Sequence, residues 1–274
     1  MDIKTTDTIY KETYWFLFHN DELLVKECEG NTSILLASDI KLLANQPTEV
    51  QSIGIFHEHE CFIANISNDN VPHGFSFKKI RPLYGYIDDE YFGAACRAFH
   101  IINWMRNSKF CGCCGGIMTM SSHEIAMECS ICDHMVYPRI SPAIIVAVIR
   151  DNQILLAHAK RFPPNRYSVI AGFVEPGETL ENCVRRELQE EVGIEVDTIT
   201  YFGSQPWSFP DCLMVAFTAQ SSTERITIDN DEISAAAWFS PHNLPNLSDL
   251  PDRPSISRKL IDWFIETYQH PSIT

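Results

Sequence analysis

Three glutamates in the second half of the chain carry its strongest chemical signal. Glu187, Glu190 and Glu191 stand at positions i, i+3 and i+4, so a helix would place them on one face. They border an apolar stripe, and partly buried like charges are unfavourable unless a cation joins them. Carboxylate oxygens with room for water suit Mg²⁺ or Mn²⁺. The spacing therefore predicts a divalent-metal site, and a solvated acidic face is the alternative.

Four cysteines form a second candidate site. Cys111 and Cys114 make one C-x-x-C pair, and Cys129 and Cys132 make another. Two such turns supply four thiolates for a tetrahedral zinc ion and leave no coordination position for water. We therefore predict a structural zinc ion, with a redox pair or plain buried thiols as the alternative. Cys113 falls between the paired positions and is left out of the ligand set.

The glutamates need a helix that packs against a core. Apolar residues recur every four positions around them, at Leu180, Val184, Leu188 and Val192. This stripe predicts a helix over residues 179–191. Thr179 is suited to be its N-cap, and Gly193 is suited to end it.

The segments around this helix predict a mixed α/β domain. Residues 143–149 form a continuous apolar run, typical of a strand buried on both faces. Asp151-Asn152 then predicts a turn, and residues 154–157 predict a returning strand. The chain closes with an amphipathic helix whose apolar residues are Leu260, Ile261, Phe264 and Ile265.

The first part of the chain has a different pattern. Short apolar runs at 14–18, 33–36 and 61–64 are separated by polar turn clusters, which predicts a small sheet-rich domain. A helix is expected to open at residues 88–90. His57-Glu58-His59-Glu60 is expected on a strand with both histidines on one face, a weak metal signal that differs from H-E-x-x-H. The sequence shows no internal repeat.

Composition limits the classes of function. The 274 residues favour two domains and allow a small third insert, and 36 acids against 21 bases give a net charge of -15. Such a charge argues against a general binder of nucleic acid or of anionic membranes. No apolar run reaches the roughly 18–20 residues of a membrane span, and the first residues lack the apolar core of a secretory signal. With ten cysteines expected to be reduced or metal-bound, we predict a cytoplasmic protein.

The spacing around the acidic helix resembles a known motif. Every fixed position of the Nudix box is matched, by Gly172, Glu178, Arg186-Glu187, Leu188, Glu190-Glu191, Gly193 and Ile194. The region from about 140 to 270 therefore resembles a Nudix hydrolase domain. The resemblance implies an α/β/α sandwich that hydrolyses a nucleoside diphosphate linked to another group. Metal ions bound by the glutamates would explain how an acidic protein handles an anionic diphosphate.

A second motif narrows the resemblance to the NADH pyrophosphatase family. That family carries a signature S-Q-P-W-P-F-P-x-S-L-M, and this chain reads Ser204-Gln205-Pro206-Trp207-Ser208-Phe209-Pro210 followed by Leu213-Met214. Ser208 replaces the usual proline, and Cys212 replaces the usual serine. The family also has a four-cysteine zinc ribbon just before the Nudix domain. We therefore expect an N-terminal α+β domain with a linking helix at 1–107, a zinc ribbon at 108–138 and a Nudix domain at 139–270.

The resemblance also implies roles for particular residues. The implied catalytic and metal-binding residues are Glu187, Glu190, Glu191 and Glu232, with Ala171 at the metal site. The implied substrate contacts are Arg81, Glu124, Tyr137, Ala171, Gln205, Pro206, Trp207, Ser208, Phe209, Pro210, Asp211, Cys212 and Ser257. Trp207 and Phe209 offer aromatic faces on which a base could stack.

The resulting expectation is a homodimeric, Mg²⁺- or Mn²⁺-dependent enzyme that hydrolyses NAD(H) to nicotinamide mononucleotide and AMP. The resemblance also implies removal of NAD caps from RNA 5′ ends, as a further activity or, in an alternative interpretation, as the main one. Glu187 and Glu191 would hold metal, while Glu190 or Glu232 would assist the attacking water. The alternatives are a Nudix enzyme for ADP-ribose or diadenosine polyphosphates, and a non-catalytic zinc-ribbon protein that binds nucleic acid. The sequence has no Rossmann G-x-G-x-x-G, so we expect the dinucleotide to be cut and not used for redox chemistry.

Overall fold

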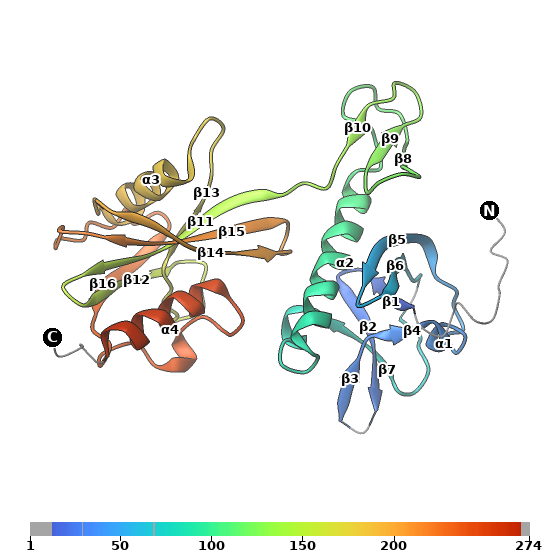
Figure 1. Ribbon diagram of the computed structural model, residues 1–274, viewed down its shortest axis with the longest axis horizontal. Coiled ribbons are helices and arrows are strands. Elements are labelled where there is room, and N and C mark those ends of the chain that lie inside the picture. The colour runs from blue at the N-terminus through green and yellow to red at the C-terminus, as the bar shows by residue number, and fades with distance from the viewer. Residues whose placement is uncertain (1–12, 29, 68, 270–274) are drawn as a thin grey trace. The chain divides into compact units, whose positions relative to one another are not determined.

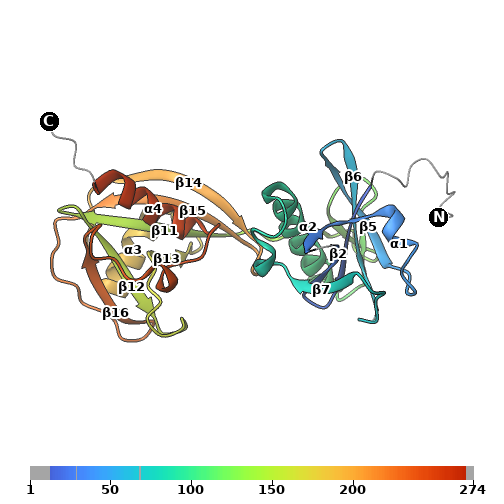
Figure 2. The same ribbon diagram turned by 90° about the horizontal axis from the view of Figure 1, so that it is seen from below.

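The computed structural model describes residues 13–28, 30–67 and 69–269. Its two compact units are residues up to 139 with 208–210, and residues 140–207 with 211 onward. Figure 1 and Figure 2 show the elements of each unit from two directions. The parts of the expected domains at residues 1–12 and at 270 lie outside the described residues.

The second unit is built around the long apolar strand that the sequence predicts. This strand, β11 (Ser141–Arg150), pairs antiparallel with β12 (Gln153–Ala159) and parallel with β15 (Cys212–Gln220). The sheet has the order β14-β15-β11-β12-β16, and β13 also pairs with β11. The remaining strands are β13 (Ile170–Phe173), β14 (Ile199–Trp207) and β16 (Ile233–Phe239).

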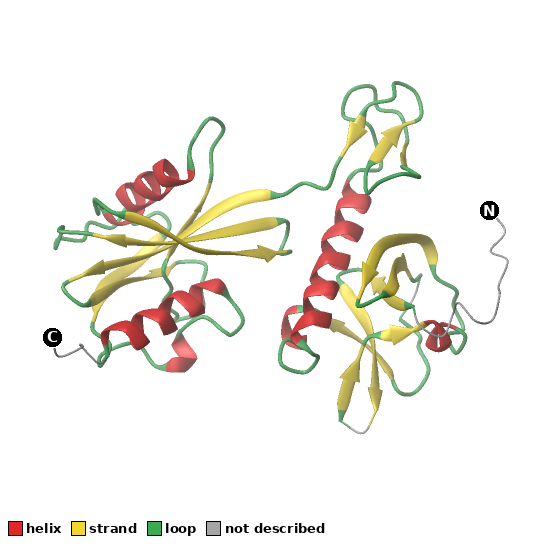
Figure 3. Ribbon diagram, in the orientation of Figure 1, coloured by secondary structure: helices red, strands yellow, loops and turns green. Residues whose placement is uncertain are grey.

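Two helices cover opposite faces of this sheet (Figure 3). Helix α3 (Leu180–Val192) packs with Ile144, Val146 and Val148 of β11. Helix α4 (Ile256–Tyr268) packs with the alternate residues Ile145, Ala147 and Ile149. Successive side chains of a strand point to opposite faces, so one continuous apolar strand supplies both cores. The expected α/β/α sandwich is confirmed.

The first unit contains a second sheet, as the short apolar runs predict. Its order is β3-β2-β1-β6-β5, with β4 on β1 and β7 on β2. The elements are β1 (Tyr14–His19), β2 (Glu22–Cys28), β3 (Asn31–Ser33), β4 (Leu35–Leu36), α1 (Ala37–Ile40), β5 (Thr48–Phe56), β6 (His59–Asn65) and β7 (Phe75–Lys79). One expectation is wrong here: His57 and Glu58 form the turn between β5 and β6, with φ of 47° and 66°, so the two histidines do not share a strand face.

Helix α2 (Asp89–Asn107) leads from this sheet to a small three-stranded ribbon. The side chain of Asp88 caps the helix by accepting a hydrogen bond from the Glu90 backbone N at 2.9 Å. The ribbon has the order β10-β9-β8 and consists of β8 (Met118–Met120), β9 (Met127–Cys129) and β10 (Met135–Val136). Short 3-10 turns lie at Arg81–Leu83 and Leu247–Asp249.

The two larger sheets share one pairing scheme, although the sequence shows no repeat. In each, a two-residue turn joins the central strand to its antiparallel neighbour: β1 to β2, and β11 to β12. Each central strand pairs parallel with a later strand, β6 or β15, which pairs antiparallel with the strand before it, β5 or β14. In each unit a helix follows a short strand that pairs with the central strand: α1 follows β4, and α3 follows β13. These two helices differ in length, since α1 has 4 residues and α3 has 13.

Candidate active site and zinc centre

Helix α3 presents the glutamates because its ends and its buried face are fixed. The Thr179 side chain accepts a hydrogen bond from the Asn182 backbone N at 3.2 Å, and Gly193 ends the helix with φ 65°. Val184 and Leu188 are fully buried against the sheet. The rotation of the helix is therefore set by its apolar stripe, and the glutamates follow from that rotation.

Arg186 ties three of the acidic side chains together. Its Nε donates to Glu178 Oε1 at 2.9 Å, and its Nη1 donates to Glu187 Oε1 at 2.8 Å and to Glu190 Oε2 at 3.0 Å. Its Nη2 donates to the backbone O of Phe173 at 2.9 Å. Because these donors point at the protein, Arg186 positions carboxylates and is not placed to receive a substrate.

Gly172 makes room for one of these carboxylates. A Cβ atom at this position of β13 would lie 1.8 Å from Cδ of Glu187. Glu187 therefore lies directly against the strand backbone, and its side chain is only 12% exposed. Burial raises the pKa of Glu187. The glycine of the motif is required here for close approach, since any side chain would displace the carboxylate.

Glu191 is the most buried of the helix glutamates, with 7% of the residue exposed. Burial, together with the charges of Glu187 and Glu232, raises its pKa to about 8. A carboxyl in this position ionises readily only when a positive charge joins it. The buried carboxyl of Glu191 therefore suits a hard divalent cation. The structure does not gather the glutamate oxygens around one point: among the described residues, only the four paired cysteines form a group of three or more candidate ligands whose atoms lie within 4.8 Å of one another.

Glu232 reaches the same site from a different part of the chain. It follows a loop in which the Asp229 carboxylate accepts three backbone hydrogen bonds, of 3.1, 3.4 and 3.3 Å. Its Oε2 lies 3.8 Å from Nη1 of Arg161, and its side chain is 63% exposed. The charges of Glu232 and Arg161 both act on the pKa of Glu191. Sequence reasoning missed Arg161 and Asp229, and the only available signal was the position of Asp229 three residues before Glu232.

The four paired cysteines converge as the spacing predicts. Their sulfur atoms all lie within 4.8 Å of one another. The Sγ atoms of Cys111 and Cys132 are 3.7 Å apart, and those of Cys114 and Cys129 are 3.4 Å apart. A tetrahedral zinc ion with Zn–S bonds of about 2.3 Å requires about 3.8 Å between sulfurs, so the cluster fits zinc.

Backbone N–H groups stabilise the thiolate form of two of these ligands. Those of Cys114 and Cys113 lower the pKa of Cys111 to about 6, and those of Ile131 and Cys132 lower the pKa of Cys129. Cys113 is exposed, and its own thiol is outside the cluster. Neighbouring thiols of the cluster raise the pKa of Cys114 and Cys132, so a cation would be needed to hold all four in the thiolate form. Four sulfur ligands that leave no position for water are the pattern of a structural zinc ion.

The predicted substrate loop connects β14 to β15. Gln205 Nε2 donates to the backbone O of Pro254 at 3.0 Å, and Gln205 Oε1 accepts from the Ile256 backbone N at 2.7 Å. This side chain therefore ties β14 to the start of α4, where Ser257 is buried. Pro206 and Trp207 pair with β15, Trp207 opposite the buried Cys212.

The other predicted substrate residues are distributed as follows. Ala171 pairs with Ile145 in the sheet, and the backbone O of Asp211 accepts a hydrogen bond from the Ser141 backbone N at 2.9 Å.

The remaining predicted substrate residues lie in the first unit. Ser208 is buried, Pro210 is exposed, and the ring centroid of Phe209 lies 5.6 Å from that of Phe99. Tyr137 donates to Glu124 Oε1 at 3.1 Å, and both residues are exposed. Arg81 is exposed at the start of its 3-10 turn.

Comparison with known proteins agrees with this geometry. The NUDIX domain model matches residues 139–264. The model of the NADH pyrophosphatase-like rudimentary NUDIX domain matches residues 12–104, and that of the NADH pyrophosphatase zinc ribbon matches residues 106–137. A Nudix hydrolase from Nitrosomonas europaea superposes with a TM-score of 0.52 at 21% identity, over 59% of this chain and 93% of its own, which supports the fold.

The sandwich, the box and the glutamate helix together define a hydrolase of the Nudix class. Two curated relatives carry the name NAD-capped RNA hydrolase NudC. That of Photobacterium profundum is 38% identical over 91% of this chain and 90% of its own, and that of Pseudomonas putida (strain F1) is 42% identical over 78% and 76%. The chain therefore belongs to the NADH pyrophosphatase family of Nudix hydrolases, as the sequence motifs indicate. Within the described residues, each helix is too short or too polar to cross a membrane.

Proposed function

We propose that this enzyme hydrolyses the diphosphate linkage of NAD(H), releasing nicotinamide mononucleotide and AMP. The same linkage at NAD-capped RNA 5′ ends is the second proposed substrate, and the names of the curated relatives support it. The observation that carries the proposal is Glu191, buried on the Nudix helix, with its pKa raised by burial and by the charges of Glu187 on the same helix and Glu232 before β16. Such a site would bind divalent cations, and the bound cations would in turn bind the anionic diphosphate of the substrate.

Glu187, Glu190, Glu191 and Glu232 would hold the cation, which we propose to be Mg²⁺ or Mn²⁺ because all the donors are hard oxygens. The position of Ala171 on β13, next to Gly172 and Glu187, supports its place at the same site. A bound divalent cation would neutralise the diphosphate oxygens and lower the pKa of the attacking water.

Arg186, Glu190 and Glu232 have different proposed roles in the reaction. Arg186 holds Glu187 and Glu190 in place before substrate arrives. Glu190 accepts a hydrogen bond from Arg186 Nη1 at 3.0 Å, whereas Glu232 makes only a longer ion pair, 3.8 Å from Arg161 Nη1. We therefore prefer Glu232 to Glu190 as the group that accepts the proton of the attacking water.

Substrate recognition is assigned to residues outside the box. We propose that Tyr137 and Glu124, which are hydrogen-bonded to each other and exposed, contact the substrate together with the loop 205–212, Ser257 and Arg81. Within the loop, Trp207 and Phe209 are both proposed to offer aromatic faces to a base, and the ring of Phe209 also packs against Phe99.

We also propose a cytoplasmic homodimer. All ten cysteines are free, and four of them are arranged as zinc ligands, which suits a reducing compartment. Large apolar side chains stand exposed on and beside the zinc ribbon, with Phe110 71%, Ile117 63% and Ile131 71% exposed. Exposed apolar groups of this kind favour contact with another protein surface, and a second copy is the proposed partner. Sedimentation of the purified chain measures this directly.

Product analysis in H₂¹⁸O tests the activity. The full chain is incubated with Mg²⁺ or Mn²⁺ and with NADH, ADP-ribose or NAD-capped RNA in parallel. We expect AMP and reduced nicotinamide mononucleotide from NADH, with ¹⁸O in one of the two phosphates. Turnover of ADP-ribose alone would overturn the proposal in favour of a different Nudix substrate. Salt-dependent RNA retention on filters without any turnover would favour a binding protein.

A further inference from the structure

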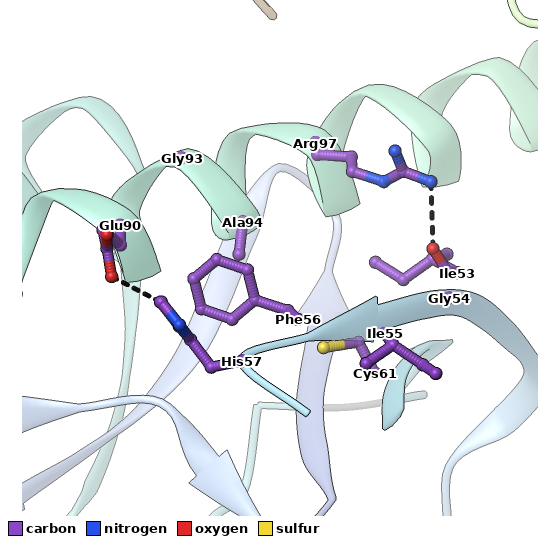
Figure 4. A pocket seen from close by; sticks show the side chains of 10 residues that line it. All are labelled: Ile53, Gly54, Ile55, Phe56, His57, Cys61, Glu90, Gly93, Ala94 and Arg97. Atoms are coloured by element: carbon purple, nitrogen blue, oxygen red, sulfur yellow. Dashed lines mark hydrogen bonds and ion pairs between the residues drawn. The ribbon is translucent and has the colours of Figure 1, made fainter. Parts of the chain in front are cut away.

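The first unit contains a cavity of about 490 Å³ that the catalytic site does not use. It lies between helix α2 and the β5–β6 hairpin (Figure 4). Among its lining residues are Ile53, Phe56, His57, Cys61, Glu90 and Arg97. The volume falls within the range of about 300–1,000 Å³ that is usual for small-molecule sites.

The cavity occupies a particular place in the repeated strand scheme. Phe56 is the last residue of β5 and pairs with His59, the first residue of β6. Trp207 is likewise the last residue of β14 and pairs with Cys212, the first residue of β15. Phe56 thus takes the position in its sheet that Trp207 takes in the Nudix sheet.

The helix on the other side of the cavity corresponds in the same way. Helix α2 follows β7 as α4 follows β16. Glu90 is the second residue of α2, and Ser257 is the second residue of α4. The cavity is therefore built from the positions whose counterparts in the Nudix unit, Trp207 and Ser257, are proposed above to contact substrate.

Among residues 13–28, 30–67 and 69–139, which the structure describes, no element of the first unit corresponds to the glutamate-bearing helix of the box. Where α3 carries three glutamates of the box, α1 is four residues long and has one carboxylate, Asp39. Asp39 is 3% exposed and binds Lys26 Nζ at 2.6 Å, so an internal ion pair already satisfies it. A ligand in this cavity would be bound without being cut.

The lining chemistry indicates what the ligand is. Figure 4 shows the Phe56 ring beneath the helix, with the His57–Glu90 ion pair at one end of the cavity and Arg97 at the other. The ring centroids of Phe56 and His57 lie 4.2 Å apart with the rings edge to face at 68°, so two aromatic groups line the cavity side by side. In the part of the chain that the structure describes, Arg97 donates one hydrogen bond, from Nη2 to the Ile53 backbone O at 2.9 Å. Its guanidinium keeps further N–H groups for an anion.

We propose that this cavity is a non-catalytic binding site for a 5′-mononucleotide. The base lies against Phe56 and His57, a polar edge of the nucleoside meets Glu90, and the phosphate binds Arg97. AMP is the simplest member of this class and is used here as the probe. The choice of a nucleotide rests in part on the substrate roles proposed for Trp207 and Ser257, but the site lies in the first unit and can be tested whichever dinucleotide the Nudix unit cuts.

Photo-crosslinking with 8-azido-AMP tests the site on the full chain in buffer without Mg²⁺ or Mn²⁺. We expect an adduct in the peptide that contains residues 53–61, and we expect excess AMP to suppress it. Arg97→Ala should weaken protection by AMP about tenfold or more, as removal of a charged hydrogen bond predicts, and Arg97→Lys should restore part of it. Lys79→Ala removes an exposed cation from the same unit and should leave protection unchanged.

Two results would overturn the site. One is labelling confined to residues 140–264 while the variants keep their melting temperature. The other is labelling of residues 53–61 that neither AMP nor Arg97→Ala diminishes. NADH turnover by the same preparations is measured in parallel, so a failure of the proposed hydrolysis appears in that assay and a failure of the mononucleotide site appears in the labelling.

Discussion

The Arg186 guanidinium binds the Glu178 carboxylate through two parallel hydrogen bonds, from Nε to Oε1 at 2.9 Å and from Nη2 to Oε2 at 3.0 Å. This contact from Arg186 is the main reason why the pKa of Glu178 falls to about 2. Burial of Glu191 on the same helix raises its pKa to about 8. Arg186 thus keeps Glu178 ionised, whereas Glu191 ionises readily only when a cation binds beside it.

Glu191→Gln is expected to lower NADH turnover by roughly a thousandfold, because several kcal/mol of charge stabilisation depend on the bound cation. The melting temperature without divalent cations should stay near the wild-type value or rise, since a buried carboxylate and its like-charge repulsion are removed. Steady-state kinetics and calorimetry measure both. Glu181→Gln, an exposed change on the same helix, is the control and should alter neither. Unchanged turnover of Glu191→Gln would exclude it as a ligand.

The stability of the protein without Mg²⁺ or Mn²⁺ should depend on pH through Glu191. Its pKa is raised from 4.5 in the free side chain to about 8 in the fold, so the folded state retains a proton that the unfolded chain loses. The contribution of Glu191 to stability is therefore complete below about pH 4.5 and is lost as the pH rises through about 8. Relative to Glu191→Gln, the wild-type free energy of unfolding should fall by on the order of 2–4 kcal/mol across this range. Parallel pH curves from urea unfolding would contradict this.

Cys129→Ser should release the zinc ion and destabilise the ribbon. Structural zinc can contribute on the order of 10 kcal/mol to folding, so loss of one of four thiolates is expected to lower the melting temperature strongly. Elemental analysis should find about one zinc per chain in the wild type and almost none in the variant. Cys113→Ser removes a neighbouring thiol outside the cluster and should retain zinc. A stable wild-type protein without zinc would refute the assignment.

Gly172→Ala should impair catalysis through Glu187. The added Cβ would lie 1.8 Å from Glu187 Cδ, so the carboxylate must leave its place against β13. We expect turnover to fall about ten- to a hundredfold and the Mg²⁺ concentration for half-maximal activity to rise, because a displaced ligand binds the cation poorly. Gly93→Ala is the matched control, since a Cβ there meets no atom within 4 Å. If Gly172→Ala kept full activity at low Mg²⁺, Glu187 would not be a ligand in its present position.

The sequence by itself determined the local parts of this protein. Helix α3 follows from apolar residues at helical spacing between Thr179 and Gly193, and the zinc cluster follows from two C-x-x-C turns. The strand β11 and its turn to β12 are also encoded locally. Each of these features depends on residues a few positions apart, where period and turn chemistry decide the structure.

Only the tertiary structure decided which distant residues meet. Glu232 and Arg161 join Glu191 because β12 and β16 pair in the sheet, and nothing local in their sequence encodes that pairing. Burial of Glu191, and hence its raised pKa, depends on all the elements packed around it. The shared strand scheme of the two units is equally invisible in the residues, since many apolar sequences satisfy the same strand pairing.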